Sequence, residues 1–268
     1  MICAGNFSFV LIFMLESIWT SAGNHRIHAR CAVKSAPLDS HPVVLVHGLG
    51  MSHRYMMPTL RALAPHARTF APDLPGFGLS DKPSEVLDIK QLAGALALWL
   101  RINNLHRATL AGNSFGCQII AELASENYGI APRALVFIAP TIDRRARTVS
   151  QQIFRLLLDA PRERLSLLPL AIREYLFTVG FRRALDTLRF AIADHIEDKL
   201  PRITIPTLVV RGGRDPLVPQ SWTEEVTRLL PRGELVVIKA AAHAVNYDAP
   251  HELARVVLRF MRDVVETA

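Results

Sequence analysis

The stretch ATLAGNSFGCQIIAELASEN, residues 108–127, decides the fold that we expect for this chain. It opens with a short apolar run at 108–111 that is typical of a buried strand, and from Phe115 onward its apolar residues favour a helix. Between the two, Gly112–Gly116 fits the pattern G-x-S-x-G. Such a turn is so tight that a Cβ atom at either glycine would collide with neighbouring backbone. It would lift the hydroxyl of Ser114 out of the sheet, which makes Ser114 a candidate nucleophile.

Strand-like and helix-like segments alternate on both sides of this turn, which predicts a mostly parallel central sheet flanked by helices. Further strands are predicted at 25–33 (an edge strand), 42–46, 69–71, 134–139, 207–210 and 234–238, and helices at 55–64, 89–100, 115–127 and from about 250. Between 141 and 205 only helix-compatible stretches broken by prolines occur. We therefore expect one α/β domain, with a core formed by 24–140 and 206–268 and a helical cap, or lid, at 141–205.

Residues 1–23 are predicted to be an apolar N-terminal extension, either without fixed structure or signal-like. Phe7–Leu15 is strongly apolar and 20–22 (TSA) resembles a signal-peptidase site, but no Lys or Arg precedes the run as a signal peptide requires. The run has about half of the ~20 apolar residues that a membrane span needs. We expect a cytoplasmic protein, or a secreted or periplasmic one if this run acts as a signal.

The composition is that of a globular protein and limits the partners that we expect. Of 268 residues, 50% are hydrophobic, and the formal net charge is +7. The arginines are spread along the chain, which argues against nucleic-acid binding. Three scattered cysteines make neither a disulfide framework nor a zinc cluster, and the strand context of His25 and His28 predicts a solvated edge rather than a metal site. We expect a small-molecule substrate, and no metal, cofactor, nucleic acid or membrane span.

A serine hydroxyl attacks a carbonyl only with the help of a general base and of a group that orients this base. His243 and Asp215 each follow a predicted strand, at the strand ends where α/β proteins build their sites. The order Ser, Asp, His along the chain agrees with this architecture. Asp143, which also follows a predicted strand, is the competing acid. The predicted catalytic residues are therefore Ser114, Asp215 and His243.

Backbone N–H groups near the serine are candidates for an oxyanion hole. The N–H of Phe115 lies at the start of a predicted helix, aimed where an oxyanion would form. The turn HGLG at 47–50 follows another strand, and the N–H of Leu49 is the second predicted donor. His47 is expected to fix this loop as a structural histidine. The predicted supporting loop residues are His47, Gly48, Gly112 and Gly116.

Together these features resemble the α/β-hydrolase superfamily, and within it the capped, lipase-like and esterase-like serine hydrolases. The resemblance covers about His25 to Val265 and includes DLPGFGLSDKP at 73–83, which is similar to the D-x-P-G-x-G-x-S loop of that superfamily. Many relatives carry a glycine where this chain has Cys117. We expect Cys117 to be a small buried packing residue rather than a second nucleophile.

The resemblance implies cleavage of a carboxylic ester or a related acyl bond through an acyl-enzyme on Ser114. A carbon–carbon hydrolase of aromatic ring-cleavage products is an alternative, because such enzymes also show Gly-Asn-Ser at this turn and act on anionic substrates that a positive charge attracts. Their catalytic histidine is typically followed by tryptophan, whereas here it is followed by Ala244. Arginines of the lid that could bind a carboxylate are Arg173, Arg182, Arg183 and Arg189. A small-ligand sensor with little turnover is the second alternative.

Overall fold

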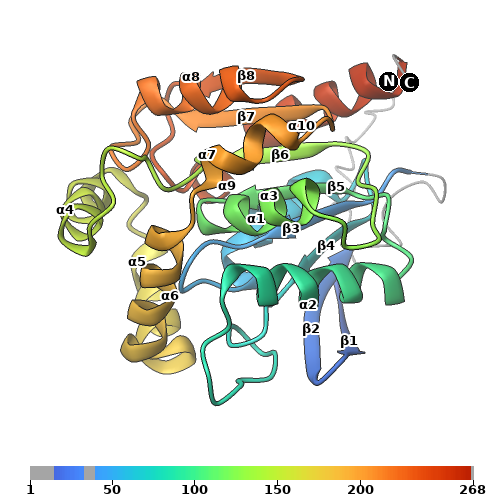
Figure 1. The fold of residues 1–268 in the computed structure, drawn as a ribbon, viewed down its shortest axis with the longest axis horizontal. Coiled ribbons are helices and arrows are strands. Elements are labelled where there is room, and N and C mark those ends of the chain that lie inside the picture. Colours follow the sequence, from blue (N-terminus) through green and yellow to red (C-terminus); the bar gives the residue numbers. More distant parts are fainter. Residues whose placement is uncertain (1–14, 33–39, 267–268) are drawn as a thin grey trace, which may run out of the picture.

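A computed structural model describes residues 15–32 and 40–266 of the chain. Its centre is a sheet with the strand order β1-β2-β4-β3-β5-β6-β7-β8 (Figure 1). The strands are β1 (Glu16–Ala22), β2 (His25–Ala32), β3 (Val43–Val46), β4 (Thr69–Pro72), β5 (Thr109–Asn113), β6 (Leu135–Ile138), β7 (Thr207–Gly212) and β8 (Gly233–Ile238). β2 pairs antiparallel with β1 and with β4, and the other neighbours pair parallel. The expected fold class, a mostly parallel sheet flanked by helices, is confirmed.

The first strand lies within the segment that we expected to precede the domain. β1 pairs with β2 along its whole length, so the expected boundary after residue 23 is wrong, and β1 rather than β2 is the edge strand. β1 buries only Thr20 and Ala22, and it therefore lacks the continuous apolar run that marks a central strand. The expectations for residues 1–14, which include most of the apolar run, lie outside the described residues.

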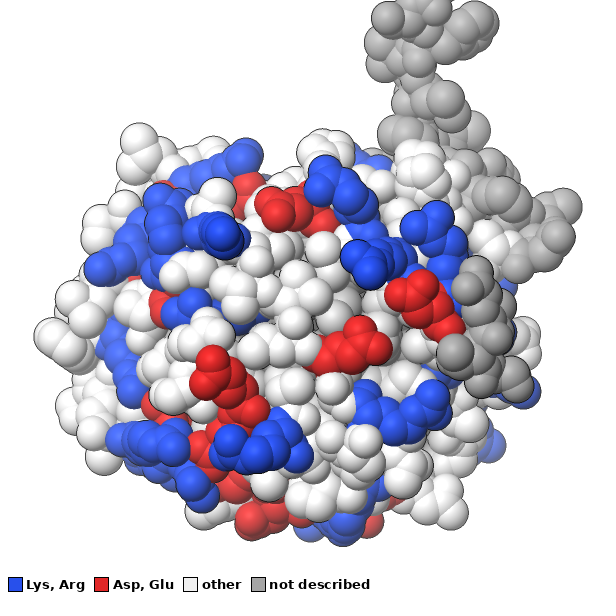
Figure 2. Space-filling model, turned by 90° about the horizontal axis from the view of Figure 1, so that it is seen from above, with Lys and Arg blue, Asp and Glu red and all other residues white. Residues whose placement is uncertain are grey.

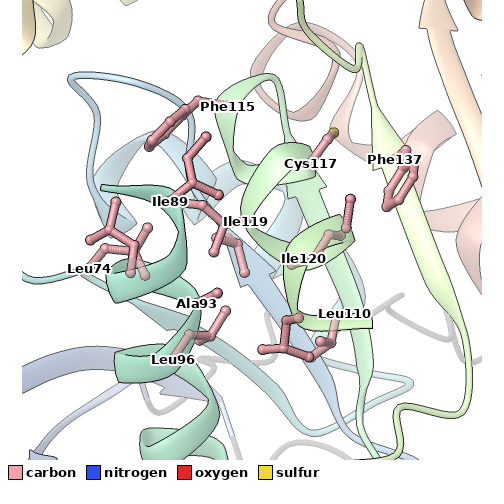
Figure 3. Packing of buried hydrophobic residues seen from close by; sticks show 14 of the residues in the cluster. Leu74, Ile89, Ala93, Leu96, Leu110, Phe115, Cys117, Ile119, Ile120 and Phe137 are labelled. Atoms are coloured by element: carbon pink, nitrogen blue, oxygen red, sulfur yellow. The ribbon is translucent and has the colours of Figure 1, made fainter. Parts of the chain in front are cut away.

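Helices cover both faces of the sheet and create two apolar layers. One layer includes Val43 and Leu45 of β3, and the other includes Val44 and Val46, because successive side chains of a strand point to opposite faces. α1 (His53–Leu63) and α10 (Pro250–Glu266) cover the first face, and α2 (Ile89–Ile102), α3 (Phe115–Ser125) and α8 (Gln220–Leu229) cover the second. Figure 3 shows α2 and α3 side by side in the second layer. With both faces covered, the carboxyl ends of the strands are left for a site.

Local sequence sets the start of two helices. At α2, the Asp88 side chain accepts a hydrogen bond from the backbone N–H of Gln91 at 2.8 Å, and the Gln91 side chain accepts one from the N–H of Asp88 at 2.9 Å. Thr148 and Gln151 make the same reciprocal pair ahead of α4 (Val149–Asp159). Each pair provides partners for backbone N–H groups that have none within the helix.

Residues 141–205, all of which are described, contain helices and no strand. We call them the helical segment. Besides α4, its elements are η1 (Ala160–Arg162), α5 (Leu167–Ile172), η2 (Arg173–Val179), α6 (Phe181–Ala193), α7 (Ile196–Lys199) and η3 (Leu200–Arg202). In Figure 1, α4, α5 and α6 lie together at the left of the molecule, beside the sheet.

The charged side chains are mixed on the face that Figure 2 shows, where Lys and Arg alternate with Asp and Glu instead of gathering in one basic patch. This arrangement agrees with the spread of arginines along the sequence. None of the helices within 15–32 and 40–266 has the length and apolar character that crossing a bilayer requires.

Candidate active site

Ser114 occupies a strained turn between β5 and α3. Its φ of 54° and ψ of −116° are unusual for a residue with a side chain. A Cβ atom on Gly112 would lie 2.6 Å from the backbone of Gly116, and one on Gly116 would lie 2.5 Å from the carbonyl oxygen of Val46. Both glycines are thus required by close backbone approach, as the sequence predicted. The N–H of Ser114 donates to the carbonyl of Ile138 at 2.8 Å, which ties the turn to β6.

Asp215 and His243 come together at the ends of β7 and β8. The Nδ1 atom of His243 lies 2.8 Å from Oδ2 of Asp215. The other carboxylate oxygen of Asp215 accepts hydrogen bonds from the N–H groups of Leu217 at 2.8 Å and Val218 at 3.0 Å, so the carboxylate is held in place. The two loops can approach because residue 212 is glycine, where a Cβ atom would lie 1.9 Å from the carbonyl oxygen of residue 242.

The competing acid, Asp143, lies in a different network. Its carboxylate accepts hydrogen bonds from Arg155 at 2.9 Å and from the N–H of Arg145 at 3.0 Å. The structure therefore brings Asp215, and not Asp143, to His243.

The surroundings of His243 favour its protonated form. Burial by itself lowers the pKa of His243, but the charge and hydrogen bond of Asp215, with a further contribution from Asp159, outweigh burial and raise the pKa above its ordinary value. The contact with Asp215 also fixes the neutral ring with its proton on Nδ1. Nε2 is then the atom that can accept a proton.

Ser114 and His243 line one cavity of about 440 Å³. The hydroxyl of Ser114 lies 3.4 Å from that of Thr141, a residue that sequence reasoning missed. Apolar side chains of the helical segment form much of the remaining wall, among them Ile153, Leu156, Phe181, Leu185 and Leu188. Within the described residues, no Lys, Arg, Asp or Glu lines this cavity.

The predicted oxyanion donors, Leu49 and Phe115, line the same cavity. Among the described residues, no protein atom accepts a hydrogen bond from the backbone N–H of Leu49 or of Phe115. His47 is buried below them, where its Nε2 accepts a hydrogen bond from the N–H of Leu74 at 3.1 Å and its Nδ1 lies 2.9 Å from the carbonyl of Gly48. Burial lowers the pKa of His47. A neutral ring with the proton on Nδ1 fits both contacts.

Two neighbouring residues of the helical segment contact the loop around Leu49, and sequence reasoning missed both. The hydroxyl of Tyr175 donates to the carbonyl of Leu49 at 3.0 Å. The buried carboxylate of Glu174 accepts from the hydroxyl of Ser52 at 2.9 Å and from Arg54 at 3.1 Å. The adjacent charges of Arg173 and Glu174 within an otherwise apolar stretch were the only available signal. These contacts attach η2 to the loop that carries one predicted oxyanion donor.

A second missed feature is a pair of carboxyl groups beside the His243 loop. Asp159 Oδ1 lies 3.4 Å from the backbone N of His243, and Glu163 Oε1 accepts from the N–H of Ala244 at 2.7 Å. Burial, followed by the charge and hydrogen bond of Asp159, raises the pKa of Glu163 to about 10. Burial also raises the pKa of Asp159. Glu163 therefore carries a proton near neutral pH.

Replacing Glu163 by glutamine is expected to flatten the decline of stability at alkaline pH. A carboxyl whose pKa is raised in the folded state stabilises it fully below the unfolded pKa, and this contribution is lost as the pH rises through the folded pKa near 10. An amide keeps both the acceptor and the donor and never ionises. We expect Glu163→Gln to melt about 3 °C above the wild type at pH 9.5 in thermal unfolding.

The control is Glu252→Gln, which removes a carboxylate from an exposed position on α10. It should follow the wild-type curve. If Glu163→Gln also follows that curve between pH 6 and pH 10, the raised pKa of Glu163 does not contribute to the pH dependence of stability.

A buried group of His28, His53 and Asp73 offers three atoms within 4.8 Å of one another, the kind of group that could hold a metal ion. Asp73 Oδ2 accepts hydrogen bonds from Nδ1 of His28 at 2.9 Å and from Nδ1 of His53 at 2.8 Å. Burial alone raises the pKa of Asp73, but these hydrogen bonds outweigh it and lower the pKa. These hydrogen bonds join the three side chains directly to one another. The solvated edge expected for His28 is wrong, because β1 covers it.

Cys117 is fully buried, and its thiol donates to the carbonyl of Gly112 at 3.1 Å. Figure 3 shows it on α3 beside Phe137 of β6. Burial raises the pKa of this thiol well above the ordinary value, so it is a poor nucleophile.

The chain is similar to several known proteins over most of its length. The model of the alpha/beta hydrolase family matches residues 43–256. The dihydrolipoyllysine-residue acetyltransferase component of the acetoin cleaving system from Pseudomonas putida is 25% identical over 82% of this chain, which spans only 63% of that relative. A pimeloyl-[acyl-carrier protein] methyl ester esterase of Yersinia pseudotuberculosis is 27% identical, with 82% and 93% of the two chains covered. The structure of a thermophilic esterase from Thermogutta terrifontis superposes with a TM-score of 0.75 at 21% identity, over 93% of this chain and 98% of the other.

Proposed function

Because this chain belongs to the α/β hydrolase family, we propose that it is a serine hydrolase that cleaves a carboxylic ester or a related acyl bond through an acyl-enzyme on Ser114. The observation that carries the proposal is the 2.8 Å contact between His243 and Asp215 at the cavity that Ser114 also lines. A nucleophile, a base and a group that orients the base are thus available at one cavity.

In the proposed reaction, Ser114 Oγ attacks the carbonyl carbon while His243 Nε2 takes the hydroxyl proton. The carboxylate of Asp215 stabilises the imidazolium that forms. His243 then returns the proton to the leaving alcohol, and the acyl group stays on Ser114. Water, deprotonated by His243, attacks the acyl-enzyme and releases the carboxylic acid, which restores the serine.

The N–H groups of Leu49 and Phe115 would hold the oxyanion. Support comes from their position on the cavity wall and from the lack of a protein acceptor within the described residues. Tyr175 and His47 would act as positioning residues, because Tyr175 hydrogen-bonds to the carbonyl of Leu49 and His47 contacts the carbonyl of Gly48. The helical segment would act as the cap, since it supplies much of the apolar wall.

The cavity favours an uncharged, apolar acyl group over an anionic substrate. A ligand carboxylate needs a cation or several hydrogen-bond donors when it leaves water. Of the arginines that could bind a carboxylate, Arg182, Arg183 and Arg189 line a separate pocket between α6 and residues 84–86 instead. We therefore favour ester cleavage over carbon–carbon hydrolysis of anionic ring-cleavage products.

The test is a side-by-side measurement of kcat/KM for p-nitrophenyl butyrate and for a 2-hydroxy-6-oxo-dienoate ring-cleavage product, because this ratio reports differential transition-state binding. We expect the ester to be preferred by at least about tenfold, since one uncompensated charge in an apolar cavity costs more than the ~1.4 kcal/mol that a factor of ten represents.

A dienoate preferred by tenfold would instead support the carbon–carbon hydrolase, on the same three residues. Binding of both compounds without turnover would support the small-ligand sensor.

A further inference from the structure

The surface of the helical segment is unusually apolar. Of the fifteen large hydrophobic side chains that are exposed among the described residues, twelve lie between 153 and 190. We call these twelve the apolar face: Ile153, Phe154, Leu156, Leu157, Leu158, Leu165, Leu168, Ile172, Leu176, Phe177, Phe181 and Phe190. Leu165 is 87% exposed, Phe177 79% and Phe181 75%. Scattered exposed residues need no explanation, but such a concentration on contiguous helices indicates a surface that is covered in use.

Most of the exposed charged side chains around the apolar face are cationic. Arg162, Arg164, Arg173, Arg182 and Arg189 are exposed between 153 and 190. The four acidic residues of the same range are buried or half-buried. All four also have partners: Glu174 pairs with Arg54, Asp186 pairs with Arg189, and Asp159 and Glu163 accept from the N–H groups of His243 and Ala244. The apolar face is therefore bordered mainly by cationic side chains, and Glu85, which lines a pocket with Phe181 and Phe190, is an exposed anion beside them.

The cavity opens at this face. Ile153, Leu156 and Phe181 line the cavity and are also exposed. A molecule that covers the apolar face therefore lies beside the route to Ser114.

We infer that the apolar face docks on an anionic lipid surface. Exposed Leu and Phe side chains bordered by arginines are the pattern of helices that lie in the interface of a bilayer, where apolar groups enter the acyl region and cations meet lipid phosphates. A second copy of the chain fits less well, because a two-fold contact between two such faces would set arginines against arginines. Nucleic acid fits less well because it offers no apolar partner for the aliphatic side chains.

The proposed docking does not depend on turnover, so it is tested with a variant that lacks the proposed nucleophile. Full-length Ser114→Ala protein is sedimented with sucrose-loaded vesicles of phosphatidylcholine, with or without about 30% phosphatidylglycerol. We expect it to partition onto the anionic vesicles at least about tenfold more strongly than onto the neutral ones, and to be released as salt screens the arginines.

Two double variants probe the two kinds of contact. Leu165→Ser with Phe177→Ser, and Arg162→Gln with Arg173→Gln, should each lower the partition coefficient by about tenfold or more. All four side chains are exposed, so the fold does not depend on their burial. The matched controls are Ile102→Ser and Arg255→Gln on α2 and α10, which are exposed outside the apolar face and should leave partitioning unchanged. The run Phe7–Leu15 is the same in every protein compared, so it cannot explain a difference between variants.

A partition coefficient that stays unchanged in both double variants would overturn the inference. Equal binding to neutral and anionic vesicles would also overturn it. Concentration-dependent dimers in light scattering, lost in Leu165→Ser with Phe177→Ser and accompanied by no vesicle binding, would show that the apolar face joins two copies of the chain instead.

Discussion

Ser114→Ala is expected to lower kcat for p-nitrophenyl butyrate by about 10⁵-fold, because removal of a nucleophile leaves only the catalysis that binding and oxyanion stabilisation provide. The variant should fold, since Ser114 makes its backbone hydrogen bond to Ile138 through its N–H and not through its side chain. Positive φ is no worse for alanine than for serine. Measurement of kcat with saturating ester checks the expectation.

A fluorophosphonate adds a direct chemical readout. We expect it to label the wild type at Ser114 alone, as mapped by mass spectrometry of peptides. Cys117→Ala is the matched control, because Cys117 lies one helical turn away in a fully buried position, and this variant should keep both the label and most of the rate. A label on Cys117, or a Ser114→Ala variant with most of its rate, would contradict the proposed acyl-enzyme.

Asp215→Asn is expected to lower kcat/KM by about 10⁴-fold with little loss of fold. The amide oxygen can still accept the N–H groups of Leu217 and Val218. It cannot, however, stabilise an imidazolium, and its NH2 group would favour the wrong tautomer of His243. The carboxylate of Asp215 is also the main group that raises the pKa of His243, so the remaining activity should change its pH dependence.

The sign of that change follows from the role of the base. His243 must be neutral to take a proton, so kcat/KM of the wild type should rise with pH through a midpoint above the ordinary histidine value of about 6.5. In Asp215→Asn the midpoint should move to lower pH. Asp143→Asn is the matched control, since its carboxylate meets Arg155 and not His243, and we expect its rate within about threefold of the wild type. A larger loss in Asp143→Asn than in Asp215→Asn would reverse the assignment of the acid.

The sheet and the candidate site residues could be predicted because their signals are local. A buried parallel strand is a continuous apolar run, and the glycines of the turn at Ser114 are demanded by backbone atoms a few residues away or in the next strand. β1 was not predicted, because an edge strand with one solvated face buries too few residues to form such a run.

The contacts of the helical segment could not be predicted from sequence. Tyr175 hydrogen-bonds to Leu49, which lies 126 residues away in the chain, and Glu163 accepts a hydrogen bond from Ala244, which lies 81 residues away. Nothing in the local sequence marks Glu163, which follows η1, or Tyr175 of η2, because their contacts and the raised pKa of Glu163 arise only when distant elements pack together. Tertiary packing, and not local propensity, decides such roles.

The strained backbone of Ser114 also bears on how the sequence could change. A residue with a side chain in this conformation costs on the order of 1–3 kcal/mol relative to an unstrained one. Glycine would relieve much of this cost but would remove the hydroxyl. For a residue with the proposed role of nucleophile, selection for stability and selection for activity oppose each other at this position. Selection for thermal stability alone would therefore disfavour serine at this position. Stabilising substitutions should be sought elsewhere in the fold.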